Sequence, residues 1–154
     1  MKPNGLTILC CCFMVAGLAA VAQAAELPSG FRLEPIATGL DSPSDVAPAP
    51  DGRLFITELK TGDLVQVRHG EVAAAPLCHV DVETTGDAGL LGVAVHPKFA
   101  ENGWVYLYYT DLTAGTNRVA RFTVSGDECS DGATYLELGG SAPYVRNGGG
   151  IEFG

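Results

Sequence analysis

Two charged side chains stand beside glycine-rich stretches of backbone, and both have the chemistry to contact a polar ligand. The first is Arg146, which precedes Asn147 and the run Gly148 to Gly150. A guanidinium offers a fixed fork of donors that suits carboxylates and phosphates, but it has no acceptor and keeps its proton in a protein. Arg146 therefore indicates an anion contact and not a general base; an exposed position before a turn is the other open interpretation.

The second candidate is Asp87, in the stretch TGDAG (85–89). A carboxylate accepts hydrogen bonds from hydroxyl groups, and a buried one can act as a weak base. Aspartate is also common in turns of this composition, where it bonds its own backbone. The residues alone leave both interpretations open, a pocket carboxylate or a turn aspartate.

Other chemical motifs are too loosely spaced to support a site. The glycine run lacks the spacing of a phosphate-binding loop, and no Lys-Ser or Lys-Thr pair follows it. The histidines lack metal-ligand spacing, so we predict no metal site. His96 is predicted to pack or to cap a turn before Pro97, and His69 and His79 to lie isolated on the surface. Four aspartates are spread over turns without the tight spacing of a calcium loop: Asp41, Asp45, Asp51 and Asp63.

The N-terminal residues have the pattern of a secretory signal peptide. Lys2 is followed by an apolar run (6–21) and then by Ala22-Gln23-Ala24, a small-residue end that suits a signal peptidase. The run is short for a membrane span, and an uncleaved membrane anchor is the alternative. We expect a signal helix in 1–24 and a mature chain, 25–154, that is secreted or periplasmic and has no membrane segment.

The cysteine content and the charge of the mature chain limit its cross-links and the classes of partner that it can bind. Cleavage leaves Cys78 and Cys129, an even pair in an oxidising compartment, which makes a disulfide and two separate buried thiols equally open interpretations. The whole chain has a net charge of −9, and Lys2 is the only charged residue lost with the signal peptide. An acidic chain without a basic stripe argues against nucleic acid and anionic membranes as partners.

The elements that would position these side chains are strands, and we predict an all-β fold. Runs of β-branched and aromatic residues are punctuated by Gly and Pro every several residues. Residues 53–59 and 63–70 form a predicted hairpin whose loop, Lys60-Thr61-Gly62, places glycine at a positive-φ position. Residues 104–112 and 117–127 form a second hairpin, and 134–139 a further strand. The aromatic residues of the second hairpin are predicted to fill a sheet: Trp104, Tyr106, Tyr108 and Tyr109.

An internal repeat indicates how the strands are organised. Residues 45–58 can be laid over 92–109, at a spacing of about 47 residues that suits a four-stranded propeller blade. Residues 149–154 begin a third copy. We therefore expect about two four-stranded antiparallel blades plus the first strand of a third, a partial propeller whose open strand edges favour self-association. A complete sandwich of two sheets is the alternative.

Four stretches together resemble the N-terminal third of the glucose/sorbosone dehydrogenase family. They are LDSPSDVAPAPDGRLFITE (40–58), GDAGLLGVAVHPKFAENGWVYLYYT (86–110), NRVARFTV (117–124) and RNGGGIEFG (146–154). The resemblance covers residues 31–154. It implies a six-bladed β-propeller, a small sugar of the aldose or sorbosone type as substrate, and pyrroloquinoline quinone (PQQ) with calcium as the cofactors of the parent family.

The resemblance also implies roles for the two charged candidates. The family carries an H-x-G-G motif whose histidine is the catalytic base, and Arg146 occupies that position here. Gln or Glu often precedes the G-L-L-G string and points into the central pocket, and Asp87 stands at that place. Most PQQ and calcium contacts come from later blades. We therefore expect a fragment of a secreted dehydrogenase that is inactive and does not bind PQQ or calcium, with a non-catalytic carbohydrate- or protein-binding module as the alternative.

Overall fold

The computed structural model describes residues 27–138 and 147–154, so the predicted signal peptide and Arg146 lie outside the described residues. The chain divides into two units, Met1–Glu34 and Pro35–Gly154. In the described part of the first unit, Arg32 pairs with Glu34 at 2.7 Å and no helix or strand forms. The described residues hold no helix with the length and apolarity needed to cross a bilayer.

The first sheet of the second unit, sheet 1, follows the chain in antiparallel order through β1 (Pro43–Pro48), β2 (Leu54–Glu58) and β3 (Asp63–Arg68). Two short strands, β4 (Glu71–Val72) and β5 (Cys78–His79), pair with β3. Pro76 lies between them and has no N–H to donate to a ladder, which explains the interruption. The predicted four-stranded blade therefore has its outermost strand in two pieces.

The second sheet, sheet 2, is a four-stranded antiparallel meander. Its strands are β6 (Leu90–Val95), β7 (Trp104–Thr110), β8 (Asn117–Ser125) and β9 (Glu128–Glu137). A single helical turn, α1 (Phe99–Asn102), connects β6 to β7. The predicted hairpins are both present, and the all-β prediction is confirmed. Strand β9 pairs only with β8 among the described strands, so its outer edge is open to a further chain.

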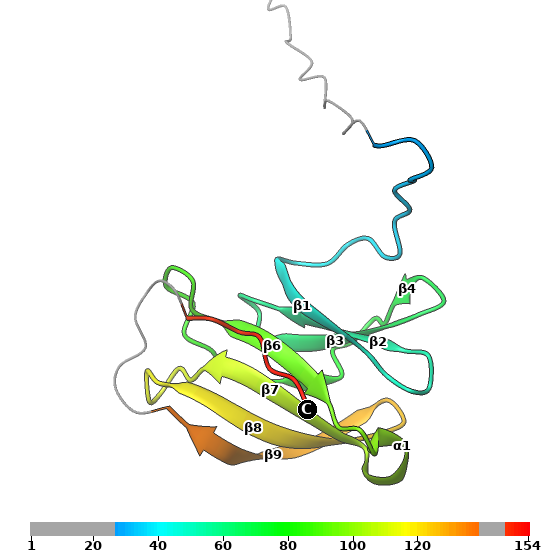
Figure 1. Ribbon diagram of the computed structural model, residues 1–154. Helices are drawn as coiled ribbons and strands as arrows, with labels where there is room; N and C mark the ends of the chain where they lie inside the picture. The colour runs from blue at the N-terminus through cyan, green and yellow to red at the C-terminus, as the bar shows by residue number, and fades with distance from the viewer. Residues whose placement is uncertain (1–26, 139–146) are drawn as a thin grey trace, which may run out of the picture. The chain divides into compact units, whose positions relative to one another are not determined.

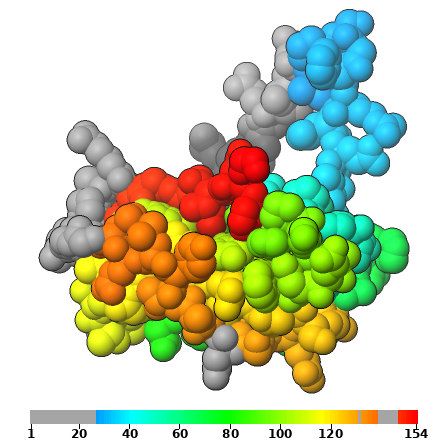
Figure 2. All heavy atoms as spheres, turned by 60° about the horizontal axis from the view of Figure 1, so that its bottom comes forward, coloured from blue at the N-terminus to red at the C-terminus, as the bar shows by residue number. Residues whose placement is uncertain are grey.

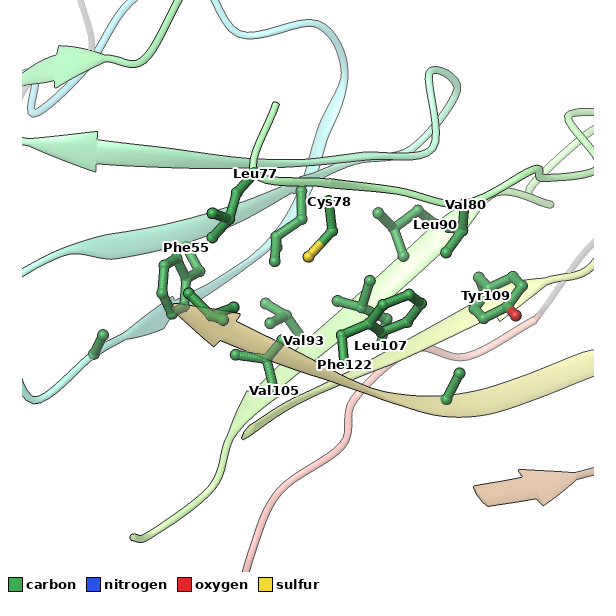
Figure 3. Packing of buried hydrophobic residues seen from close by; sticks show 14 of the residues in the cluster. Phe55, Leu77, Cys78, Val80, Leu90, Val93, Val105, Leu107, Tyr109 and Phe122 are labelled. Atoms are coloured by element: carbon green, nitrogen blue, oxygen red, sulfur yellow. The ribbon is translucent and has the colours of Figure 1, made fainter. Parts of the chain in front are cut away.

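The hydrophobic core lies between the two sheets, which are neighbours in Figure 1. Figure 3 shows Phe55 of β2 on one side of this core, with Val93, Val105 and Leu107 of sheet 2 on the other. Because successive side chains of a strand point to opposite faces, β7 contributes Val105, Leu107 and Tyr109 to the core from every second position. Each sheet buries its apolar face against the other, so the two are expected to fold as one cooperative unit.

A buried arginine ties the sheets together at one end. Arg53 follows the turn between β1 and β2 and is only 5% exposed. Its guanidinium pairs with Asp51 at 2.6 Å and donates to the carbonyl oxygen of Gly126, in the turn between β8 and β9, at 2.7 Å. The side-chain hydrogen bond from Arg53 lowers the pKa of Asp51. The guanidinium also lies 5.0 Å from the ring centroid of Phe55.

A disulfide joins the outer strands of the two sheets. It links Cys78 of β5 to Cys129 of β9, with 5.3 Å between the Cα atoms. The two cysteines are separated by 51 positions in the sequence. The bond therefore closes a long loop of chain that contains the whole of β6, β7 and β8.

The C-terminal segment (147–154) runs along β6 in Figure 1 and lies on the surface in Figure 2. The ring of Phe153 lies 5.1 Å from that of His96 and 5.2 Å from that of Tyr106. The predicted first strand of a third copy is present only as backbone without a strand ladder. Its backbone lies close to β6 at Gly92, and its Phe153 ring contacts the rings of His96 and Tyr106. A strand needs a hydrogen-bonded neighbour to form.

Candidate functional site

Four chain connections meet at one end of the two sheets, which we call the loop end. They are the β2–β3 loop (59–62), the β5–β6 connection (80–89), the β7–β8 loop (111–116) and the start of the C-terminal segment at Asn147. Backbone hydrogen bonds tie them together: the N–H of Leu90 donates to Leu59, and the N–H of Thr110 donates to Gly89, each at 2.9 Å. Asp87 lies in the second of these connections, and Asn147, the residue that follows Arg146 in the sequence, begins the fourth.

Asp87 is exposed at the loop end, in the last turn before β6. The turn is closed by a hydrogen bond from the N–H of Ala88 to the carbonyl oxygen of Thr85 at 3.1 Å. A role in contacting sugar hydroxyls stays a prediction.

Lys60 supports this turn, and the sequence analysis did not single it out. Its Nζ donates to the carbonyl oxygens of three residues, Thr84 at 2.8 Å, Gly86 at 2.6 Å and Ala88 at 2.9 Å. The only signal in the sequence was a lysine in a hairpin loop directly after a buried strand. Its partners lie 24 to 28 positions further along the chain, so local pattern reasoning could not find them.

Glu83 organises the start of the same turn. Its Oε1 atom accepts the backbone N–H groups of Thr84 and Thr85, each at 2.9 Å, and the hydroxyl of Thr85 at 2.6 Å. The hydrogen bond from the Thr85 side chain is the main reason why the pKa of Glu83 is lowered. The carboxylate of Glu83 thus satisfies two N–H groups of the turn, and the ammonium of Lys60 satisfies three of its carbonyl groups.

Asn147 is held in place by sheet 2. The hydroxyl of Tyr108 donates to the Asn147 carbonyl oxygen at 2.8 Å, and the Asn117 side-chain amide donates to Asn147 Oδ1 at 3.2 Å. Thr110 in turn donates from its hydroxyl to Asn117 Oδ1 at 2.7 Å. Burial raises the pKa of Tyr108, which keeps its hydroxyl protonated as the donor. These bonds fix Asn147; Arg146, which precedes it in the sequence, lies outside the described residues.

Two glycines allow the C-terminal segment to lie directly against β6. A Cβ atom built on Gly92 would lie 1.9 Å from the carbonyl oxygen of Gly149. Gly149 itself has a φ of +147° and a built Cβ atom only 2.8 Å from the carbonyl oxygen of Leu91. The absence of a side chain at Gly149 therefore lets this backbone pass close to β6.

Gly92→Ala is expected to displace residues 148–150 from β6. The new methyl group would meet backbone on the opposite segment, which cannot rotate away as a side chain can, so the cost is about 1–3 kcal/mol. Amide hydrogen exchange of residues 147–151 is expected to accelerate. Gly150→Ala is the control, because a Cβ atom there meets nothing within 4 Å. Equal exchange in both variants would contradict the close packing of the segment on β6.

Arg118 and Asp111 form the rim of the loop end on sheet 2. Arg118 pairs with Asp111 at 2.7 Å and with Glu137 at 3.3 Å. The other oxygen of Asp111 accepts the N–H groups of Thr113 at 3.0 Å and Ala114 at 2.6 Å. The guanidinium is thus committed to two carboxylates of its own chain.

The histidines lie away from the loop end or on its outer side. His96 caps a turn, as predicted: its Nδ1 accepts the backbone N–H of Lys98 at 3.0 Å. His69 is exposed. His79 is exposed but not isolated as predicted, since its Nδ1 lies 2.7 Å from Asp63 Oδ1 on the adjacent strand β3. Within the described ranges no group of three His, Cys, Asp or Glu side chains is arranged to hold a metal ion.

Comparison with known families relates both sheets to sugar dehydrogenases. The family model described as Glucose / Sorbosone dehydrogenase matches residues 40–144. The aldose sugar dehydrogenase YliI of Escherichia coli is 33% identical over 86 residues, which is 55% of this chain and 23% of that protein. The matched residues include β1 to β9 and the first three connections of the loop end, but not Asn147.

Solved structures show the same arrangement of strands. The PQQ-bound aldose sugar dehydrogenase of Streptomyces coelicolor is 33% identical with a TM-score of 0.69, covering 79% of this chain and 37% of that one. A glucose dehydrogenase-like putative oxidoreductase of Thermus thermophilus is 32% identical with a TM-score of 0.73, covering 81% and 38%. The chain thus spans little more than a third of these relatives and corresponds to part of a β-propeller.

Proposed function

The chain belongs to the glucose/sorbosone dehydrogenase family, and from this membership we propose that it is the N-terminal part of a secreted or periplasmic PQQ-dependent sugar dehydrogenase. The substrate class proposed for the whole enzyme is an aldose or a sorbosone-type sugar. The observation that carries the proposal is the match over residues 40–144, because it spans both sheets and three of the four connections of the loop end. Relatives named as aldose sugar dehydrogenases, one of them PQQ-bound, support the reaction class.

We further propose that this chain is inactive by itself. Oxidation of a sugar hydroxyl requires a group that accepts its proton within hydrogen-bond reach. Arg146 stands at the position where the family has its histidine base, and a guanidinium has no acceptor atom for that proton. An arginine at this point is suited to holding an anionic group in place but not to deprotonating a sugar.

The described residues of the loop end do not fit PQQ, a quinone that carries carboxylate groups. An anionic cofactor needs cations or free N–H donors. The two cationic side chains described at this end, Lys60 and Arg118, already donate to groups of their own chain. Nor does the described part of the chain gather three carboxylate, imidazole or thiolate ligands for a metal ion such as calcium. We therefore assign no step of the reaction to PQQ or calcium on this chain.

The second candidate function is a secreted, non-catalytic module that binds a carbohydrate or a protein. The observation that favours it is the same Arg146, since loss of the base removes the chemistry and leaves the scaffold intact. Reading the coding DNA past the Gly154 codon separates the two candidates. Further blades in frame favour the dehydrogenase, and a stop codon favours the binding module.

A dye-reduction assay tests the proposed inactivity. The purified chain is incubated with PQQ, Ca²⁺, glucose and an electron-accepting dye, and we expect no dye reduction above buffer. A PQQ-dependent glucose dehydrogenase in the same mixture serves as the positive control. Dye reduction that depends on both the chain and PQQ would show that the chain is active without further blades and would overturn this part of the proposal.

A further inference from the structure

Lys60 occupies the centre of a ring of carbonyl groups. The carbonyl oxygens of Thr84, Gly86 and Ala88 lie 2.8, 2.6 and 2.9 Å from its Nζ atom. An ammonium has three N–H donors and no acceptor, so these three partners use its whole hydrogen-bonding capacity. The three oxygens come from alternate residues of one short turn, which therefore wraps a cation that is tethered to the neighbouring hairpin.

The turn depends on a positive charge at this point. Three carbonyl dipoles that converge on one position repel one another unless a cation or several donors lie between them. Lys60 is half-buried, which makes replacement of its donors by water less complete than at a free surface. Glu83 satisfies the N–H groups of Thr84 and Thr85 but contributes nothing to the carbonyl side of the turn.

The turn carries Asp87 and is linked to the rest of the loop end. Gly89, directly after the turn, accepts the N–H of Thr110 at 2.9 Å. The Thr110 hydroxyl donates to Asn117, whose amide donates to Asn147. Hydrogen bonds, joined by the covalent links from Ala88 to Gly89 and within Thr110, thus connect Lys60 to Asn147.

We propose that Lys60 is a positioning residue: by donating to three carbonyls of the 84–88 turn, it sets the backbone direction from which Asp87 reaches into the loop end. One part of this proposal rests on the proposed function, namely that the ligand of Asp87 is a sugar. Lys60 itself does not contact the ligand, because all of its donors are used by the turn. Its contribution is to hold the carboxylate in one orientation before a ligand arrives.

Lys60→Met tests the role of the ammonium, because methionine keeps an unbranched apolar stem and removes the charge and the donors. Amide hydrogen exchange of residues 84–90 in the full chain is expected to accelerate about ten- to hundredfold. Lys98→Met is the matched control, since Lys98 is exposed beside α1 at the opposite end of the sheets. Unchanged exchange of the turn in Lys60→Met would overturn the proposal.

A rescue experiment separates donation from simple packing of the lysine stem. In Lys60→Ala, added methylammonium is expected to restore slow exchange of the 84–90 amides, since it can donate to the three carbonyls. Tetramethylammonium has the same charge but no N–H group, and it is expected to restore nothing. Equal rescue by both ions, or by neither, would contradict the donor role.

The orientation of the Asp87 backbone tests directly whether Lys60 positions this residue. Residual dipolar couplings of the Asp87 amide report the direction of its N–H bond. They are expected to be reduced by averaging in Lys60→Met and unchanged in Lys98→Met. Couplings that stay the same in Lys60→Met would overturn the positioning role.

These measurements involve no sugar, quinone or turnover, so their outcome is separate from that of the dye assay. If the turn loosens in Lys60→Met but the protein proves not to be a sugar dehydrogenase, the positioning role of Lys60 holds. Only the sugar is then removed as the ligand of Asp87. A turn that stays rigid without the ammonium would remove the role of Lys60 whatever the assay shows.

Discussion

Truncation of Leu107 to alanine is expected to lower the free energy of unfolding by about 2–5 kcal/mol. Leu107 is 0% exposed and sits in the middle of β7, paired with Val93 of β6 and Ala120 of β8. Its side chain points into the core that the two sheets share (Figure 3). The variant loses apolar burial and leaves a cavity that the strands on either side cannot close, because their ladders hold them apart.

The measurement is urea unfolding followed by circular dichroism and by tryptophan fluorescence. Leu112→Ala is the matched control, with the same truncation five positions along the chain at a residue that is 54% exposed. That variant is expected to change the free energy of unfolding by no more than about 0.5 kcal/mol. If the two variants were equally stable, Leu107 would not belong to a core on which both sheets depend.

The hairpins of both sheets could be predicted because their signals are local. Lys60-Thr61-Gly62 was predicted as a loop with glycine at positive φ, and Gly62 has a φ of +76°. Alternation in 63–70 predicted β3, which the structure places at Asp63–Arg68. Such patterns act over a few residues, where side-chain periodicity and turn geometry determine the backbone.

The length of β9 could not be predicted. The strand predicted from the sequence starts at residue 134, whereas β9 in the structure starts at Glu128. The missed residues (128–133) include the polar residues Glu128, Ser130 and Asp131, and Gly132 lowers strand propensity further. In the structure a Cβ atom on Gly132 would lie 2.4 Å from the Phe122 ring on β8, so the glycine makes room for that ring. Packing between strands thus overrides the local preference.

The sequence indicates two charged candidates for the site, but it does not indicate the residues that support them. Asp87 and Arg146 stood out through neighbouring glycines and the family resemblance, and their roles remain predictions. Tyr108 and Asn117 anchor Asn147 across 39 and 30 positions of sequence. Contacts over such distances depend on how the two sheets stack, which the periodicity of one strand does not specify. Lys60 was missed as a supporting residue for the same reason.

Loss of the disulfide is the second change expected to have a large effect. In the double variant Cys78→Ala/Cys129→Ala, we expect the free energy of unfolding to fall by about 4 kcal/mol. The bond spans 51 positions, and removing it restores the conformational freedom of that stretch in the unfolded chain. Alanine fits the buried site of Cys78 and the half-buried site of Cys129 without introducing a polar group, so the loss measures mainly the cross-link.

Reductant provides the matched control for the disulfide. Dithiothreitol is expected to lower the urea midpoint of the native chain toward that of the double variant, and to leave the double variant itself unchanged. The two sheets still share the core around Phe55 and Leu107, so the reduced chain should unfold in a single transition at lower urea. Two separate transitions after reduction would show that the cross-link, and not the core, makes the sheets cooperative. A native midpoint insensitive to reductant, with the cysteines shown to be reduced, would contradict the expected stabilisation.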